Sequence, residues 1–450
     1  MQHRSSFPLP ATPPASPLTL AATWPFDVRK TPFFYGWVIW VLSTVGFLIS
    51  VPGQTMGMAV FTDPFMAAFG LSRTELSTAY FFGTLGSSLF LTRAGRWYDR
   101  HQARAMIVGS CLVLAAVLVF ISSIDSVIES FGPPWQNWLA FALILAGYFG
   151  VRFAGQGILT SASRNVLLVW FERRRGLVSG VRGVVVSLGF SIAPLILAFM
   201  IDGWGWRGAL WLMALGVAAF GGVSLLFVRD TPESCGLLPD GAAPAPDGLR
   251  PLPERHDLTL DQARRTGAFW IYAGSLSMHA LFGTAFTFHI VAIFAEAGRD
   301  RVEAFGYFLP QAIVSMLVNL GASALVDRRP LKPLLLLMLF GFMSGAWGLM
   351  HLDRSWGYWL LVLGFGTGGG LWGVLSNLAF VRSFGRLHLG EISGLNTSLT
   401  VFASAVGPLL FSAGQDWFGN YDAAVALCLC LNGLLLFAAF TLREPQPALP

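Results

Sequence analysis

The chain has 450 residues, of which 54% are hydrophobic and 12% are charged, and its mean hydropathy is +0.62. Soluble domains carry about a quarter charged residues, so this composition excludes an ordinary water-soluble protein. The net charge of +5 is modest and gives no reason to expect a nucleic acid as a partner.

Residues 1–32 are rich in Pro and Ser and lack the apolar stretch of a signal peptide, so we predict a disordered tail there. Twelve apolar runs follow, each near the length of about 20 residues that crosses a bilayer as a helix. The sequence therefore predicts an all-α integral membrane protein with twelve transmembrane helices. The predicted spans are residues 33–60, 75–94, 105–124, 138–165, 177–201, 208–228, 268–295, 304–326, 333–350, 357–381, 391–413 and 421–442.

A polar segment rich in Pro and Gly, residues 229–267, divides the twelve spans into two sets of six. We predict a linker there that ends in a short helix at 258–266. The linker separates a first bundle, residues 33–228, from a second bundle, residues 268–442, and a short tail follows at 443–450.

Lys and Arg are unevenly distributed between the two sides of the predicted membrane. With the linker in the cytoplasm, 21 of the 29 Lys and Arg residues lie on the cytoplasmic side if Arg93, at the inner end of the second span, is counted there; five lie outside and three lie deeper within the spans. Short loops rich in these residues are retained in the cytoplasm. We therefore expect a multi-pass protein of the cell (inner) membrane, surrounded by lipid, with both termini cytoplasmic.

The two halves repeat a pattern at a constant offset of 214 residues. Transporters use internal repeats of this kind to form a substrate site between two bundles. We therefore expect two pseudo-symmetric six-helix bundles. The matching pairs are Gly176 and Gly390, Ser179 and Ser393, Gly180 and Gly394, Pro194 and Pro408, and Asp202 and Asp416.

The loop after the second predicted span reads Gly95-Arg-Trp-Tyr-Asp99-Arg100-His-Gln-Ala-Arg104, and a degenerate copy, Ser323-Ala-Leu-Val-Asp327-Arg328-Arg329-Pro-Leu-Lys332, follows the eighth. The pair resembles the loop signature of the major facilitator superfamily. This resemblance implies the major facilitator fold and a gate in which Gly permits close packing, Asp caps a neighbouring helix end and Arg braces it. Ser323 departs from the pattern, so the packing of the second copy is less defined. The expected gating residues are Gly95, Asp99, Arg100, Arg104, Asp327 and Arg328.

Two further stretches resemble the monocarboxylate and oxalate/formate porters of that superfamily. They are Trp170-Phe171 with Arg174-Arg175-Gly176-Leu177, and the sequence RDTPESCGLLPDG after the sixth span. Carriers of that branch have a basic residue in the eighth or eleventh span, whereas this chain offers Gln311, Asn319 and Asn396 there. The resemblance therefore implies a carboxylate-type carrier without assigning its substrate.

Arg152 lies in the middle of the fourth predicted span, roughly 15 Å from either interface of a core about 30 Å thick. A central Arg costs at least ~2.5 kcal/mol, so it is expected to face a partner or a wet cavity. Its repeat equivalent is Gly366, which means that the scaffold does not require a cation there. The alternative is a structural bridge inside the first bundle, although no acidic residue lies in the middle of any span.

A polar stripe follows the fourth span, if that span is a regular helix turning about 100° per residue. Such a stripe lines a water-accessible path or makes interhelical hydrogen bonds. The stripe consists of Tyr148, Arg152, Gln156, Thr160 and Ser163.

Arg182 lies about five residues inside the fifth span. We expect its side chain to extend to the cytoplasmic edge of the membrane.

His279 and His289 in the seventh span are the intramembrane side chains with an ordinary pKa near neutrality. Either one can carry a coupling proton, and a packed neutral His is an equally good interpretation of each. The candidate substrate-binding residues are Arg152, Tyr148, Gln156, His279, Asn319, Trp372 and Asn377, and the proton-coupling candidates are His279 and His289.

These features predict a secondary active transporter of a small organic anion, with a carboxylate as the expected class and proton coupling as an option. A guanidinium binds a carboxylate through two hydrogen bonds. The alternatives are an exporter of larger apolar compounds and a transport-dead sensor that uses the segment 229–267. No enzyme, cofactor or metal is expected, since the four Cys lack metal-site spacing and Gly366–Gly370 lacks the Lys of a phosphate loop. We expect a monomer.

Overall fold

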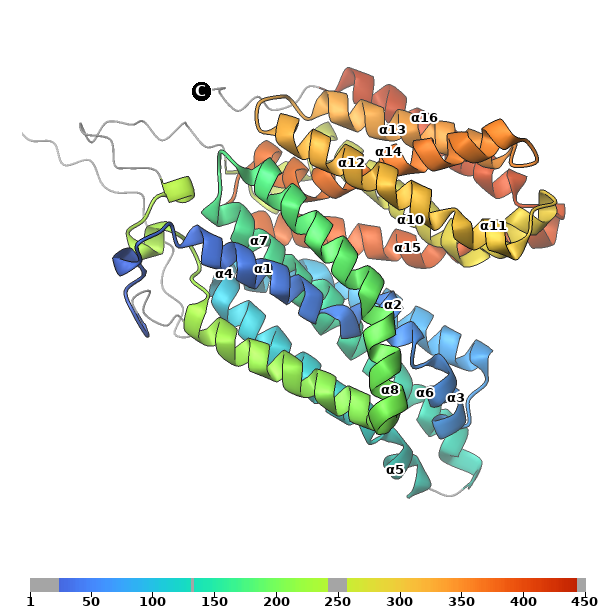
Figure 1. Cartoon of the computed structure of the whole chain (residues 1–450), viewed down its shortest axis with the longest axis horizontal. Coiled ribbons are helices and arrows are strands. Elements are labelled where there is room, and N and C mark those ends of the chain that lie inside the picture. Colours follow the sequence, from blue (N-terminus) through green and yellow to red (C-terminus); the bar gives the residue numbers. More distant parts are fainter. Residues whose placement is uncertain (1–23, 131–132, 242–256, 443–450) are drawn as a thin grey trace, which may run out of the picture.

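The computed structural model describes residues 24–130, 133–241 and 257–442, and every regular element in these ranges is a helix (Figure 1). Long apolar runs fold this way because a helix satisfies its own backbone hydrogen bonds where water is absent. The all-helical prediction is confirmed. The predicted tail at 443–450 lies outside the described residues.

The first half of the described chain, residues 24–241, is built from helices that are broken at several points. Non-helical backbone at Gln102 and Gly205, both with φ of 67°, divides α4 and α8 into two legs each. A π-helix, η3, interrupts the fourth span. The elements are α1 (Gly36–Ile49), α2 (Thr55–Ala59), α3 (Thr62–Phe69), α4 (Arg73–Ser122), α5 (Ile124–Glu129), α6 (Pro133–Val151), η3 (Arg152–Leu159), α7 (Thr160–Trp170) and α8 (Arg175–Phe227).

The second half, residues 257–442, has more regular helices. Thr266 caps its first long helix by accepting a hydrogen bond from the Phe269 N–H at 3.2 Å. The short helix expected at 258–266 is present as α9. The elements are α9 (Leu260–Ala263), α10 (Gly267–Glu296), α11 (Arg301–Gly306), α12 (Phe308–Val326), α13 (Lys332–Leu349), α14 (Ser355–Phe384), α15 (Leu389–Phe418) and α16 (Asp422–Thr441).

Nine helices in the described part of the chain are long and apolar enough to cross a membrane. The legs of α4 and α8 supply two spans each, and the shorter apolar helix α1 supplies the first, which accounts for the twelve predicted spans. The first span is shorter than the predicted 33–60. Helix α1 ends at Ile49 because Pro52 and Gly53 follow in a 3-10 turn.

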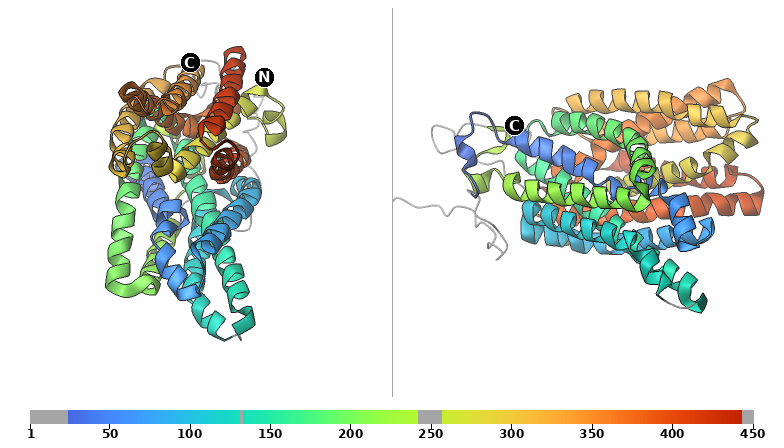
Figure 2. Two further views of the ribbon diagram at one scale, coloured as in Figure 1. Left: turned by 90° about the vertical axis from the view of Figure 1, so that its right-hand side faces the viewer. Right: turned by 60° about the horizontal axis from the view of Figure 1, so that its bottom comes forward.

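Each half encloses its own buried core, and Figures 1 and 2 show the halves as two bundles lying side by side. Pro194 in α8 and Pro408 in α15 occupy matching helices, as the repeat predicts. We call the end of the molecule that carries the described parts of the linker, 229–241 and 257–266, the linker end. It lies at the left in Figure 1.

The predicted disordered tail is wrong for its described part, residues 24–32. Asp27 caps a short 3-10 helix (Val28–Lys30), and Val28 is buried. The Phe26 ring packs 6.1 Å from that of Tyr35 and 5.8 Å from that of Phe227. These aromatic contacts hold the segment against the first bundle at the linker end.

Candidate functional site

The two halves are joined close to the linker end. Among the described residues, every hydrogen bond and ion pair between the halves lies in the part of the spans nearest the linker. The bonds farthest from the linker end are those from Arg182 to Asn377, at 2.7 Å, and from Ser398 to the Ser88 carbonyl. Toward the other end of the molecule, no such bond joins the halves among the described residues.

Gly95 lies where α4 of the first half meets α15 of the second. A Cβ added at Gly95 would collide with the Gly390 carbonyl, and a Cβ at Gly390 would collide with the Gly95 carbonyl. The two backbones can approach this closely only because both residues lack a side chain. This geometry fits the close packing that the resemblance implies for Gly95.

Asp99 and Asp327 each cap a helix of the opposite half. The Asp99 carboxylate accepts hydrogen bonds from the N–H groups of Gly390 and Glu391, at 2.7 and 2.8 Å. The Asp327 carboxylate accepts from Gly176 and Leu177, at 2.7 and 3.2 Å. A carboxylate is favourable at a helix N-terminus because the free N–H groups and the helix dipole attract it.

The three motif arginines that were expected to brace the gate make no hydrogen bond or ion pair to the opposite half among the described residues. Arg104 donates to the Leu225 and Trp24 carbonyls within its own half. The side chains of Arg100 and Arg328 are exposed and form no hydrogen bond or ion pair among the described residues. The expectation that these three arginines brace the gate is therefore not met.

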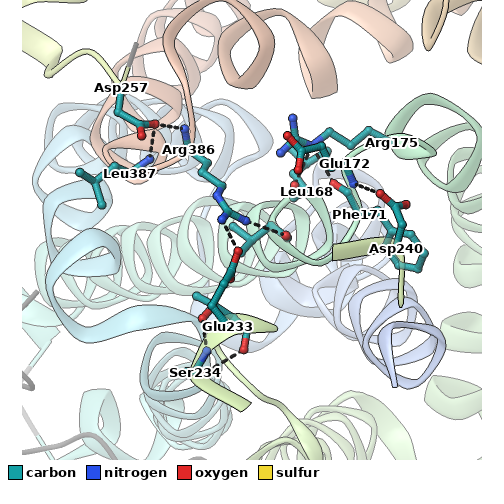
Figure 3. Close-up of polar contacts among 12 residues, drawn as sticks. Leu168, Phe171, Glu172, Arg175, Glu233, Ser234, Asp240, Asp257, Arg386 and Leu387 are labelled. Atoms are coloured by element: carbon teal, nitrogen blue, oxygen red, sulfur yellow. Dashed lines mark hydrogen bonds and ion pairs between the residues drawn. The ribbon is translucent and has the colours of Figure 1, made fainter. Parts of the chain in front are cut away.

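Two arginines that were not among the expected gating residues make the contacts instead. Arg96 pairs with Glu391 across the halves, with 3.2 Å between Nε and Oε2. Arg386, in the loop before α15, pairs with Glu233 of the linker and donates to the Val169 carbonyl of the first half at 3.3 Å (Figure 3). The position of Arg96 within the first motif was a usable signal, whereas nothing in the sequence connected Arg386 with Glu233.

The linker places one carboxylate on the same loop of each half (Figure 3). Asp240 accepts hydrogen bonds from the Glu172 and Arg173 N–H groups, at 2.9 and 2.7 Å. Asp257 accepts from the two N–H groups that lie 214 residues later, those of Arg386 and Leu387, at 2.7 and 3.1 Å. The described ends of the linker therefore fasten both loops in the same way.

Arg152, the central cation of the fourth span, is only 3% exposed and lies among neutral groups of the first half. Its Nη1 donates to the Gly53 carbonyl at 3.1 Å and to Thr55 Oγ1 at 3.4 Å. Its guanidinium lies 5.4 Å from the centre of the Tyr80 ring. Its Nε is buried without a hydrogen-bond partner, so the group keeps free donor capacity.

The regular polar stripe predicted around Arg152 does not form, because η3 is a π-helix and changes the direction of the side chains that follow. Tyr148 is buried with its ring 5.1 Å from that of Tyr80. Gln156 is partly exposed and accepts a hydrogen bond at its carbonyl from Thr160. Ser163 packs against the first helix, where its carbonyl accepts from Ser43 at 2.6 Å.

The predicted residues of the second half are mostly bonded within that half. His279 stacks on Trp372 at 5.9 Å, and Trp372 donates to the Leu276 carbonyl. Asn319 donates to the Gly370 carbonyl at 3.1 Å. His289 Nε2 lies 3.1 Å from the Pro408 carbonyl and Nδ1 lies 3.3 Å from the Tyr421 hydroxyl. His289 is thus held among α10, α15 and α16.

Arg182 does not extend to the edge of the membrane, so that expectation is wrong. The side chain is buried, 3% exposed, because the second half closes over it and supplies Asn377 as a partner at 2.7 Å. Its Nη1 lies 3.3 Å from the Ser43 hydroxyl, and its guanidinium lies 5.1 Å from the Phe47 ring centre. Of the predicted substrate-binding residues in the described chain, Asn377 is the one that bonds to the opposite half.

Comparison with known proteins decides the family, because the sequence profile of the Major Facilitator Superfamily matches residues 42–408. The chain belongs to the Major Facilitator Superfamily. Members of this superfamily move small molecules across membranes and are not enzymes. The protein is therefore a multi-pass secondary transporter.

Sequence relatives of this superfamily member are distant. A probable hexose phosphate transport protein of Chlamydia muridarum is 23% identical over 448 residues, which cover 92% of this chain and 91% of the relative. A protein of the same description from Chlamydia pneumoniae is 24% identical over 211 residues, 46% of this chain and 40% of the relative. These comparisons do not establish a branch, and they do not support the resemblance to monocarboxylate porters.

Solved structures of the superfamily share the fold. The human organic anion transporter MFSD10 aligns with a TM-score of 0.61 and 16% identity, covering 91% of this chain and all of that one. The Escherichia coli fucose:proton symporter aligns with a TM-score of 0.62 and 14% identity, covering 91% and 99% of the two chains. At this identity the likeness extends to the fold alone.

Proposed function

We propose that this transporter carries a small organic anion with a carboxylate or phosphate group, by alternating access between its two bundles. One observation carries the proposal: the spans of the first half bury Arg152 and Arg182 and partly bury Arg164, and none of the three has an acidic partner among the described residues. A buried charge without a counter-ion is costly, and a bound anion removes that cost. The names of the distant relatives, which specify hexose phosphate, agree with an anionic cargo.

We place the anion between Arg152 and Arg182, with Gln156, Asn319 and Asn377 as neutral neighbours. The guanidinium groups supply charge-assisted hydrogen bonds, which are stronger than bonds between neutral groups. We further propose that both termini face the cytoplasm of a cell membrane, since the topology expected from the sequence assigns 21 of the 29 Lys and Arg residues to the side of the linker. Gly95, Asp99 and Asp327 then belong to a cytoplasmic gate, which is closed in this structure.

Uptake by the purified full chain in liposomes tests the proposed cargo. The probes are glucose 6-phosphate, inorganic phosphate, oxalate and lactate, each with and without an inward proton gradient, and fucose is the neutral comparison. We expect saturable uptake of at least one anion and none of fucose. Uptake of fucose but of none of the four anions would refute the anionic cargo. Efflux of an apolar dye, with no uptake of any of the five probes, would favour an exporter of apolar compounds.

A further inference from the structure

The hydrogen bond between Arg182 and Asn377 marks the boundary between the joined and unjoined parts of the two halves. Arg182 lies seven residues after the start of α8 at the linker end, and Asn377 lies seven residues before the end of α14 there. At a rise of 1.5 Å per residue, both lie about 10 Å inside the bundle. With the Ser398–Ser88 contact, theirs is the cross-half bond farthest from the linker end among the described residues.

The buried guanidinium of Arg182 donates fewer hydrogen bonds than it has N–H groups. It has five N–H donors, and its described hydrogen bonds go to the Asn377 and Ser43 side chains, which are both neutral. Its Nε is buried without a partner. Arg164 lies near enough for its charge to act on Arg182, and Arg164 Nη2 is likewise buried without a partner. Among the described residues, this pair of cations therefore has no negatively charged partner, and it has N–H donors without an acceptor.

Asn377 is oriented to serve as an acceptor for Arg182. Its Nδ2 donates to the Gly373 carbonyl one turn earlier at 2.6 Å, which directs Oδ1 toward the guanidinium. The repeat equivalent of Arg182 is Asn396, whose Oδ1 is also buried without a partner. The fold therefore accepts a neutral side chain at this position, and the arginine is not needed for packing alone.

We propose that Arg182 couples substrate binding to the gate: the anion takes the guanidinium from Asn377 and so breaks one of the two side-chain bonds between the halves that lie farthest from the linker end. This inference rests on the proposed anion transport. A carboxylate or phosphate binds the guanidinium more strongly than an amide oxygen does, because both partners are charged. Loss of the bond to Asn377 weakens the closed linker end and lets the bundles separate there. Binding thereby favours the conformation that releases the cargo.

Two substitutions of Asn377 test the coupling while Arg182 stays in place. Asn377→Ala removes the competing acceptor, so affinity for the anion is expected to rise about tenfold and the linker end to open without anion. Asn377→Asp supplies a permanent counter-ion, so affinity is expected to fall at least tenfold and the linker end to stay closed. Ser398→Ala is the matched control, since it removes the neighbouring cross-half bond without touching Arg182, and it is expected to leave affinity within about twofold.

The measurements use the full chain in detergent. Equilibrium dialysis with radiolabelled glucose 6-phosphate, inorganic phosphate, oxalate and lactate gives affinity. Maleimide labelling of a Cys introduced for the buried Ser323 reports opening, in a background in which the four natural Cys are replaced by Ser. In the parent chain, anion binding is expected to increase labelling several-fold.

The outcomes separate the inference from the proposed function. If the parent chain transports an anion but both Asn377 variants bind and label like the parent, the coupling role of Arg182 is refuted and anion transport stands. If the parent chain neither binds nor transports any of the four anions, both proposals fail. Arg182→Gln is expected to abolish both binding and anion-induced labelling. If that variant does not fold, as judged by size-exclusion chromatography, the two Asn377 variants still decide.

Discussion

Asp99 and Asp327 form two reciprocal helix caps. The Asp99 carboxylate of the first half caps a helix of the second half, and the Asp327 carboxylate of the second half caps a helix of the first. The N–H groups bound by Asp99, those of Gly390 and Glu391, are the repeat equivalents of the Gly176 and Leu177 N–H groups bound by Asp327. The closed linker end is thus held by a reciprocal pair of helix caps. When the bundles separate at this end, both caps must release.

The first prediction concerns these caps. Each carboxylate uses both of its oxygens as acceptors, so Asp99→Asn and Asp327→Asn each leave one of the capped N–H groups facing an amide NH2 that cannot accept, and a buried donor left without its partner costs about 1–3 kcal/mol. We expect the closed linker end to lose population by about tenfold or more and the transport rate to fall, while anion affinity changes little. Uptake and binding measured in parallel check this, with the exposed Asp353→Asn as the control. Equal losses of affinity and rate would instead indicate a displaced binding site.

The second prediction is a pH dependence that arises from Asp327. Burial raises the pKa of its carboxyl above the usual range, against the lowering effect of the Gly176 and Leu177 N–H donors. A raised pKa means that proton binding favours the closed arrangement over one in which the carboxyl is exposed. The free energy by which the proton on Asp327 favours the closed arrangement is fully present below the ordinary pKa of about 3.9. It is lost as the pH rises through the raised pKa.

Labelling of the Cys at position 323 is therefore expected to fall as the pH is lowered through that window. Asp327→Asn has no proton to bind there and is expected to remove part of the dependence. Identical pH profiles for the parent chain and the Asp327→Asn variant would show that this carboxyl does not contribute.

The third prediction concerns the linker. Glu233 pairs with Arg386 of the second half, so Glu233→Arg is expected to weaken the closed linker end by like-charge repulsion. Combining it with Arg386→Glu restores opposite charges. Because Arg386 also donates to the Val169 carbonyl, we expect the double variant to recover only part of the lost closure. Cysteine labelling at position 323 in the two single variants and the double variant measures this, and additive effects would exclude a direct interaction.

Much of the fold was predictable from the sequence, because the length of apolar runs and the 214-residue offset depend on local pattern alone. The Gly95 and Asp99 contacts also followed from the motif. The partners of Arg182 and Arg386 were not predictable, since they depend on how the two halves pack. Nor did the side-chain pattern indicate the π-helix at Arg152, which reorients the expected polar stripe.

The fourth prediction concerns proton coupling. His289 is bonded to the Pro408 carbonyl and lies near the Tyr421 hydroxyl, whereas His279 Nδ1 is buried without a partner. We therefore expect His279→Gln to abolish proton-driven accumulation and to spare exchange, which needs no net protonation change. We expect His289→Gln mainly to lower the melting temperature. Unchanged pH-dependent uptake in both single variants and in the double variant would remove histidine from the mechanism.

The last prediction tests whether Arg152 binds the anion. Arg152→Lys keeps the charge but loses the planar donor geometry, so weaker binding with some remaining transport is expected. Arg152→Gln is expected to lose most of the binding. Its contacts with the Gly53 carbonyl and the Tyr80 ring support a rival account, in which the guanidinium only fastens the first bundle.

The rival account makes a different prediction for the same two variants. Both would lower expression and melting temperature, and uptake per folded molecule would stay near that of the parent chain. Uptake normalised to folded protein, measured together with anion-induced thermal shifts, separates the two accounts, since anion present at 100 times its Kd stabilises a binding-competent protein by about 2.7 kcal/mol. Parent-like affinity in a well-folded Arg152→Gln protein would leave Arg182 as the anion-binding arginine and assign Arg152 to the structure of the first bundle.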